Sequence, residues 1–123
     1  MENILKPIWE SELEAMDVIF DICKKLNLRC YLGYGTLIGA VRHHGFIPWD
    51  DDVDLVMPRT DYELFIQKAP EFLPKHMVLN HYQISNAVDA SSTLKVENTG
   101  CRILRTYGNV ETWANAWVDI WPT

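Results

Sequence analysis

The chain has few cysteines and no long apolar run. Its three cysteines are odd in number, and no two have the C-x-x-C spacing, so neither a disulfide framework nor a zinc site is indicated. No apolar stretch approaches the roughly 20 residues that a membrane-spanning helix needs, and the first residues lack a signal-peptide pattern. We therefore expect a cytoplasmic protein with reduced thiols and no membrane span.

Positive charge is also scarce. Eleven Lys and Arg residues stand against 17 Asp and Glu, for a net charge of −6, and there is no basic stripe. This balance argues against general affinity for nucleic-acid backbone. The apolar content of 48% and charged content of 23% are those of a soluble globular protein, and 123 residues suffice for one domain with a core.

The most acidic stretch puts four carboxylates into the five residues Asp50-Asp51-Asp52-Val53-Asp54. Like charges this close cost free energy unless a cation neutralises them. The alternation predicts a β-strand with Asp52 and Asp54 on one face and apolar residues on the other. Two such carboxylates favour a hard divalent cation, Mg²⁺ or Mn²⁺, with Asp50 close by. We prefer this interpretation to a solvated acidic loop because Pro48-Trp49 and an apolar strand bracket the run.

Hydrophobic periodicity predicts a mixture of helices and strands. Helices are expected over residues 8–26 and 37–43, with a third opened by a capping box at Thr60 and Glu63; strands are expected over residues 29–32, 53–57, 77–83, 93–97, 101–107 and 116–121. Residues 85–92 are polar and predict a loop. Asn98-Thr99-Gly100 predicts a hairpin turn, and Gly108-Asn109 predicts another turn.

The second predicted helix has the features of an anion site. Thr36 is a plausible N-cap, and Gly35, Gly39 and Arg42 share one side of the helix. A helix N-terminus with free N–H groups, glycine for close approach and a nearby cation suits phosphate. The alternative is that the glycines serve only tight helix packing. Arg42 and the neighbouring acidic run lead us to prefer phosphate binding.

Asp119 is a lone acid in the apolar strand 116–121, where a charge is costly unless it is paired or bound to a metal. A structural salt bridge is the alternative to our preferred interpretation, a third carboxylate that joins Asp52 and Asp54. Lys95 is expected to be an ordinary solvated strand residue, although it is placed to reach a nucleotide. Tyr31 and Tyr34 are expected to pack in the core; stacking on a base or around a choline cation is the alternative.

Two other metal motifs fit less well. Asp50-x-Asp52-x-Asp54 matches the first ligands of an EF-hand loop, but Leu55 and Asp61 stand where that loop needs Gly and Glu. A D-x-D motif also occurs in glycosyltransferases that use nucleotide sugars. Such enzymes normally hold the nucleotide on a longer α/β segment than the 49 residues that precede this motif.

Residues 34–43 and 45–54 closely resemble the signature of the LicD/fukutin family. Val118-Asp119-Ile120-Trp121-Pro122 is similar to that family's later D-I-F-P block, with Trp121 in place of the usual Phe. A weaker likeness extends over residues 8–26 and 58–62. Family members usually continue well past the D-I-F-P block. We therefore expect the C-terminal part of the family domain to be missing, in a truncated or unusually short member.

The resemblance implies a single α+β domain over residues 1–123 with the nucleotidyltransferase fold, a small mixed sheet with helices packed on it. It implies a metal-dependent transferase that moves phosphocholine, or a similar phospho-group, from a CDP-linked donor such as CDP-choline. The implied acceptor is a glycan or glycolipid such as lipopolysaccharide or a teichoic-acid precursor. By resemblance, Asp52, Asp54 and Asp119 are the catalytic acids and metal ligands, with Asp50 a further ligand, and Gly35, Thr36 and Arg42 lie near the phosphates. The alternatives are a generic nucleotidyltransferase and a non-catalytic nucleotide-binding remnant.

Overall fold

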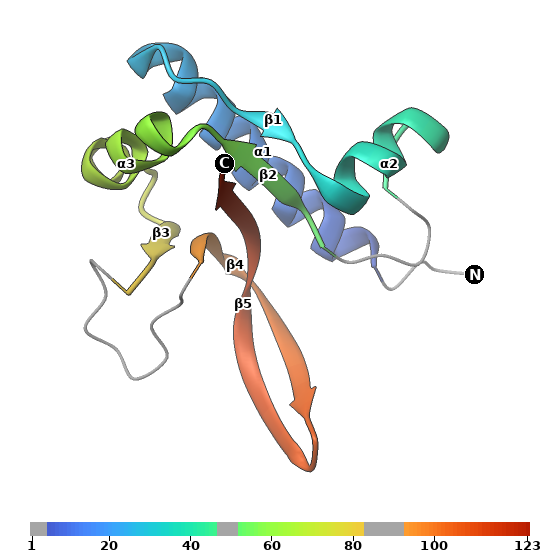
Figure 1. Cartoon of the computed structure of the whole chain (residues 1–123). Coiled ribbons are helices and arrows are strands. Elements are labelled where there is room, and N and C mark those ends of the chain that lie inside the picture. Colours follow the sequence, from blue (N-terminus) through green and yellow to red (C-terminus); the bar gives the residue numbers. More distant parts are fainter. Residues whose placement is uncertain (1–4, 47–51, 83–92) are drawn as a thin grey trace.

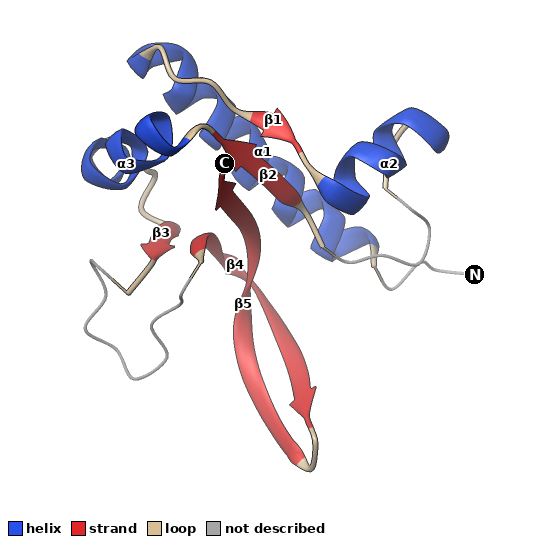
Figure 2. Cartoon of the chain, in the orientation of Figure 1, coloured by secondary structure: helices blue, strands red, loops and turns tan. Residues whose placement is uncertain are grey.

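The computed structural model describes residues 5–46, 52–82 and 93–123 (Figure 1). Its elements in chain order are α1 (Lys6–Leu26), β1 (Tyr31–Leu32), α2 (Tyr34–Arg42), β2 (Asp54–Met57), α3 (Arg59–Lys68), the 3₁₀ turn η1 (Ala69–Glu71), β3 (Met77–Asn80), β4 (Leu94–Tyr107) and β5 (Val110–Pro122). The helices pack on one mixed sheet, so the predicted α+β class is confirmed (Figure 2).

The five strands lie in the order β1-β2-β5-β4-β3. The central pair, β2 and β5, is parallel, and the other pairs are antiparallel. β2 and β5 are far apart in the sequence but lie side by side at the middle of the sheet (Figure 1). Beyond the body of the molecule, β4 and β5 continue as a long two-stranded ribbon (Figure 2). The fold therefore joins the acidic segment to the C-terminal strand.

The core lies between α1 and one face of the sheet, because both elements have an apolar side. α1 confirms the helix predicted from hydrophobic periodicity, and its buried side includes Ala15, Ile19 and Ile22. Alternate residues of β5 are fully buried on that face: Ala116, Val118 and Ile120. Phe65 of α3 completes the same cluster. The opposite face of β5 is left only half-covered, and there the polar residues gather.

The predicted hairpin at residues 98–100 is wrong. β4 runs through these residues as one strand, with a register irregularity between Asn98 and Arg102. The Asn98 side chain explains the bulge, because its Oδ1 accepts a hydrogen bond from the N–H of Gly100 at 2.9 Å. Its Nδ2 reaches α1, where it donates to Glu14 at 2.9 Å. The turn at Gly108-Asn109 is confirmed, with Gly108 at a φ of +63°. The loop predicted over residues 85–92 lies outside the described residues.

Two helix starts differ from prediction. α2 begins at Tyr34 with Gly33 as its N-cap, so Thr36 lies within the helix and is not the cap. α3 begins at Arg59 with Pro58 as its N-cap, and no side chain caps it, so the capping box is also wrong. In both cases the helix begins earlier in the sequence than the residue that the capping rules favour as its N-cap.

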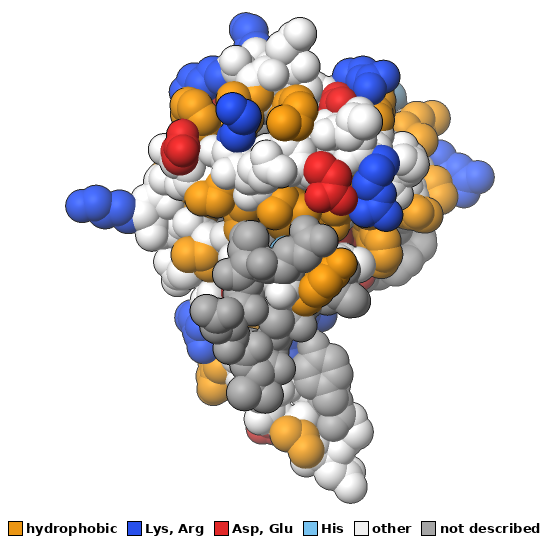
Figure 3. All heavy atoms as spheres, turned by 60° about the vertical axis from the view of Figure 1, so that its left-hand side comes forward, with side chains coloured by type: hydrophobic (Ala, Val, Ile, Leu, Met, Phe, Trp, Pro, Cys, Tyr) orange, Lys and Arg blue, Asp and Glu red, His pale blue; other side chains and the backbone are white. Residues whose placement is uncertain are grey.

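Tyr31 and Tyr34 are 55% and 63% exposed, so the predicted core packing is wrong for both. Each lies at an end or edge of its element: β1 is an edge strand, and Tyr34 opens α2. Cys23, Cys30 and Cys101 are free thiols. Among the helices that the structure describes, none has the length and apolarity to cross a membrane. On the face in Figure 3, basic side chains are scattered among acidic and apolar ones.

Candidate functional site

Three charged residues form a row across the middle of the sheet. Asp54 on β2 is the register partner of Asp119 on β5, which is in turn the partner of Lys95 on β4. Neighbouring strands are about 4.8 Å apart, and paired residues point to the same face. The structure thus brings two of the predicted carboxylates together, and the row lies on the half-covered face opposite α1.

Asp119 is held by three donors. Lys95 Nζ lies 2.6 Å from Oδ1 of Asp119, and the Thr93 hydroxyl lies 3.4 Å from the same oxygen. The indole N–H of Trp117 donates to Oδ2 at 3.0 Å. The salt bridge that the sequence left as the alternative for Asp119 is therefore present, on the same side chain that faces Asp54. Both side chains of this ion pair are partly shielded from water.

Asp54 forms the β2 end of this row, which we call the carboxylate row, and lies beside the start of α2. Its Oδ1 accepts a hydrogen bond from the indole N–H of Trp121 at 3.0 Å. Its backbone N–H donates to Oγ1 of Thr36 at 2.8 Å, and its carbonyl accepts from the N–H of Gly33 at 2.9 Å. These two bonds fix the first turn of α2 beside the N-terminal end of β2. The amide groups of that turn, which have no acceptor within a helix, therefore lie next to the carboxylates.

The remaining residues predicted to bind phosphate lie differently. Gly35 is in the first turn of α2, close to Asp54. Gly39 is buried within α2. Arg42 ends the helix, about 10 Å from Gly35 along the axis, and is exposed. The structure brings Gly35 and Thr36 to the carboxylate row and leaves Arg42 at the far end of α2.

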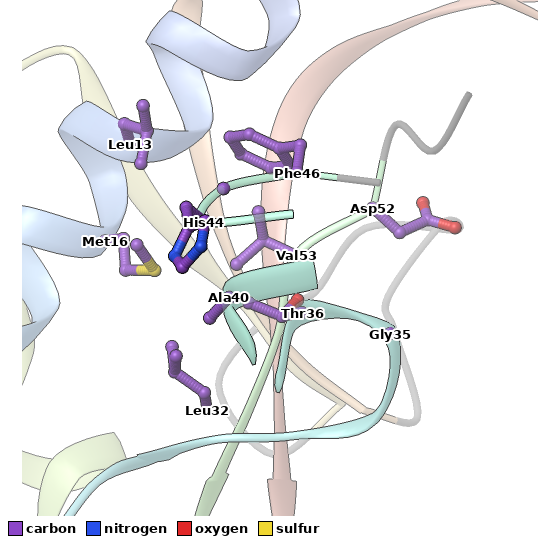
Figure 4. Close-up of a pocket in the computed structure, with 11 residues that line it drawn as sticks. Leu13, Met16, Leu32, Gly35, Thr36, Ala40, His44, Phe46, Asp52 and Val53 are labelled. Atoms are coloured by element: carbon purple, nitrogen blue, oxygen red, sulfur yellow. The ribbon is translucent and has the colours of Figure 1, made fainter. Parts of the chain in front are cut away.

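Asp52 precedes β2 and is exposed. It stands at one end of an apolar cavity of about 260 Å³ between α1 and α2, whose lining includes Leu13, Met16 and Phe46. Figure 4 shows its carboxylate directed away from these apolar side chains. Val53 is buried between Asp52 and Asp54, as the predicted alternation requires. Asp50 lies outside the described residues.

Comparison with known proteins identifies the family. Residues 27–123 match the model of the LicD/FKTN/FKRP nucleotidyltransferase domain. The chain belongs to the LicD family. The matched range covers the sheet, α2, α3 and the whole carboxylate row, so the family domain contains every residue discussed above except those of α1.

The LicD match is supported by individual relatives. A Haemophilus influenzae protein named lipopolysaccharide cholinephosphotransferase LicD is 42% identical over 77 residues, 63% of this chain and 27% of that protein. An uncharacterized protein of Rickettsia typhi is 38% identical over 71 residues, 58% of this chain and 23% of its own length. An uncharacterized protein of Rickettsia prowazekii is 40% identical over 59 residues, 48% and 22% respectively. The chain thus spans about a quarter of the length of these relatives.

The donor set of the LicD site fits a divalent cation. Two carboxylates on neighbouring strands offer hard oxygen ligands from one face, with backbone amides nearby for an anionic partner of the ion. Within the described ranges, no three His, Cys, Asp or Glu side chains already converge as a ligand group. Lys95, which lies on the other side of Asp119 from Asp54, pairs with Oδ1 of that carboxylate. An ion bound there would compete with Lys95 for Asp119.

Sequence reasoning missed the aromatic residues of the LicD site. Trp117 and Trp121 flank Asp119 on its own face of β5, and each donates its indole N–H to a carboxylate of the pair. Tyr34 contacts Trp121 edge-on, with ring centroids 6.0 Å apart, and has a φ of 50°, unusual for a bulky residue. The spacing Trp-x-Asp-x-Trp was visible in the sequence. It predicts indole donors beside the acid once the strand is assigned.

Proposed function

We propose that this LicD domain belongs to a transferase that moves phosphocholine from CDP-choline to a hydroxyl group of a cell-surface glycan, such as lipopolysaccharide or a teichoic-acid precursor. The pairing of Asp54 with Asp119, beside the first turn of α2, is the observation that carries the proposal. The choice of phosphocholine is supported by the name of the Haemophilus influenzae relative. The three free thiols are in keeping with a cytoplasmic location.

Asp52, Asp54 and Asp119 would hold Mg²⁺ or Mn²⁺, with Asp50 as a further ligand. A bound ion would neutralise negative charge on the donor's diphosphate. The amide groups at Gly35 and Thr36 are placed to hold non-bridging phosphate oxygens. Gly39 permits the close approach of α2, and Arg42 contributes positive charge from the far end of that helix.

We propose the following reaction at this site. The acceptor hydroxyl attacks the phosphorus on the choline side, so that a new O–P bond forms. The bond from that phosphorus to the bridging oxygen breaks, and CMP leaves with the electron pair. Asp119 either binds the ion or takes the proton of the attacking hydroxyl; in both roles Lys95 and Trp117 hold its carboxylate in a fixed position next to Asp54.

Aromatic residues beside Asp54 suit the choline end of the donor. Tyr34 is exposed, and its ring lies edge-on to Trp121, which is hydrogen-bonded to Asp54. A quaternary ammonium group is attracted to the faces of such rings. Their position next to a carboxylate adds favourable charge. We therefore assign Tyr34 and Trp121 to the choline group.

Product analysis tests the proposal. The chain is incubated with CDP-choline, Mg²⁺ and a deacylated lipopolysaccharide oligosaccharide, and the products are followed by ³¹P NMR. We expect CMP and a phosphocholine-bearing oligosaccharide, with turnover lost in Asp54→Asn and kept in Asp17→Asn, a matched exposed carboxylate on α1. Pyrophosphate release from a nucleoside triphosphate would instead support the generic nucleotidyltransferase. Binding of CDP-choline without turnover would support a non-catalytic remnant.

A further inference from the structure

A second cavity opens on the same face of the sheet as the carboxylate row. It measures about 420 Å³, within the range of small-molecule sites. β3, β4 and β5 all contribute to its lining, which includes Asn80, Glu97, Arg102, Trp113, Asn115 and Trp117. None of these residues has a role in the metal and phosphate chemistry proposed above, apart from the bond of Trp117 to Asp119.

The polar side chains of this cavity are fixed by one another. Asn80 Nδ2 donates to Oε2 of Glu97 at 2.7 Å, and Asn115 Nδ2 donates to Oε1 of the same carboxylate at 2.9 Å. Arg102 Nη1 donates to Oδ1 of Asn115 at 2.7 Å. Two amides, a carboxylate and a guanidinium are thus held in a chain across three strands. Planar groups of this kind form paired hydrogen bonds to neighbouring hydroxyl groups.

Two indole rings accompany this polar chain. Trp113 is 61% exposed, although it is one of the largest apolar side chains. Trp117 has Lys95 Nζ 4.7 Å from its ring centroid and the Arg105 guanidinium carbon 4.3 Å from it. Indole faces are electron-rich and attract the C–H groups that line one side of a sugar ring. The cavity thus offers a flat apolar indole face beside fixed planar polar groups. A ligand that has C–H groups on one face and hydroxyl groups at its edge matches both features.

The charges of the cavity favour a neutral ligand. The Lys95 ammonium is paired with Asp119, and Glu97 lies opposite Arg102 in the polar chain. The lining residues Lys95 and Arg102 are thus balanced by Asp119 and Glu97, which leaves no surplus of positive charge in the lining to select a phosphate or sulfate. The Arg105 guanidinium lies over the Trp117 ring and is not part of the lining. A neutral polyhydroxylated ring satisfies both the hydrogen-bonding groups and the aromatic faces.

From these observations we propose that the β3-β4-β5 cavity binds a neutral sugar ring of the acceptor glycan, with Trp113 as its stacking surface and Trp117 as part of the cavity wall. Two of its lining residues, Lys95 and Trp117, also contact Asp119, so a sugar bound here presents its hydroxyl groups next to that carboxylate. The assignment of this sugar as the acceptor rests on the proposed transferase function; the binding of a sugar does not.

Binding is measured by saturation-transfer NMR with a deacylated lipopolysaccharide oligosaccharide, in the absence of donor and metal. Trp113→Ala is expected to weaken binding about tenfold, because it removes the stacking face, whereas Trp113→Phe retains most of it. Trp113 is exposed, so neither change disturbs the core. Trp9→Phe, which lies against Phe46 in another part of the molecule, serves as the control and leaves binding unchanged.

Two results would overturn the inference: no saturable binding of the oligosaccharide, or equal binding by wild type and Trp113→Ala. Asp54→Asn separates this inference from the transferase proposal, because it is expected to abolish turnover and keep sugar binding. In the turnover assay, Trp113→Ala is expected to raise the KM for the acceptor and leave kcat unchanged. Sugar binding without any turnover would support the cavity assignment and count against the transferase.

Discussion

Asp54 and Asp119 are register partners on two parallel strands, and Lys95 lies 2.6 Å from Asp119 on its other side. Two neighbouring carboxylates repel each other unless positive charge lies between or beside them. In this structure Lys95 supplies that charge. A divalent ion between the two carboxylates would add further positive charge. The ion and Lys95 would then compete for Asp119, and this competition can be measured.

Replacing Lys95 by Met is expected to make the stability of the folded protein depend on bound Mg²⁺. Without metal, the change leaves Asp119 short of its ammonium partner and is expected to cost about 1–3 kcal/mol of unfolding free energy. Added Mg²⁺ is expected to restore more stability to the variant than it adds to wild type, because binding to the folded state stabilises it. Urea unfolding with Mg²⁺ and with EDTA measures both effects.

The control is Lys25→Met, which removes an exposed ion pair with Asp21 on α1 and is expected to change stability by less than about 1 kcal/mol. If the Lys95 variant is as stable as wild type in EDTA, or gains nothing extra from Mg²⁺, the competition does not exist.

Tyr34 has a φ of 50° at the start of α2, a conformation that glycine adopts without a steric penalty. Tyr34→Gly is therefore expected to be more stable than Tyr34→Ala by about 1 kcal/mol, although both lose the ring. Both variants are expected to bind CDP-choline more weakly, and Tyr34→Phe is expected to bind it as wild type does. Thermal unfolding and calorimetric titration measure the two effects. Equal stability of the Gly and Ala variants would contradict the strained backbone, and full donor affinity in both would contradict the choline assignment.

Gly33 holds the first turn of α2 close to β2. A Cβ at this position would lie 2.9 Å from Cγ1 of Val56, a side chain with little rotameric freedom. The backbone of Gly33 is extended, so the clash is the only obstacle. Gly33→Ala is expected to cost about 1–3 kcal/mol. In the double variant with Val56→Ala, the cost is expected to be smaller than the sum of the single changes. Additive costs in the double-mutant cycle would show that the contact is not the cause.

Acid stability is expected to depend on Asp61. The Arg29 side chain and its backbone N–H both donate to this carboxylate, and they lower its pKa to about 2. A carboxyl group with a lowered pKa stabilises the folded state above its unfolded-state pKa, about 3.9, and loses that contribution as the pH falls toward 2. Asp61→Asn is therefore expected to be less stable than wild type at pH 6. The difference is expected to shrink between pH 4 and pH 2 in unfolding curves; a constant difference would contradict the pKa shift.

Local sequence patterns predicted those helices and strands that have a clear hydrophobic periodicity of their own. The helix α1 and the alternation around Asp54 and Asp119 appear in the structure as expected, because each element has a buried side. The lone acid in an apolar strand, and then the resemblance to the LicD family, predicted that Asp119 joins the other carboxylates; the pairing of β2 with β5 was not predicted. No local pattern specifies that pairing, since the partners are far apart in the sequence.

The errors arose where distant contacts decide the local structure. Asn98 and Gly100 have the composition of a turn, but the bond from Asn98 to Glu14 of α1 and the pairing with β5 keep this segment within one strand. Tyr34 was expected in the core because it is aromatic and follows a strand. It is exposed because α2 begins there and turns away from the sheet. Trp117 and Trp121 were taken as apolar residues, and their role as hydrogen-bond donors became visible only with the register of the strands.

Mn²⁺ titration followed by electron paramagnetic resonance tests the carboxylate site most directly, because it detects the ion without donor, acceptor or turnover. We predict saturable binding to the wild-type chain, weakened by at least about tenfold in Asp52→Asn, Asp54→Asn and Asp119→Asn, and unchanged in the exposed control Asp17→Asn. Equal Mn²⁺ binding by wild type and by the Asp54 and Asp119 variants would contradict a metal site at the paired strands.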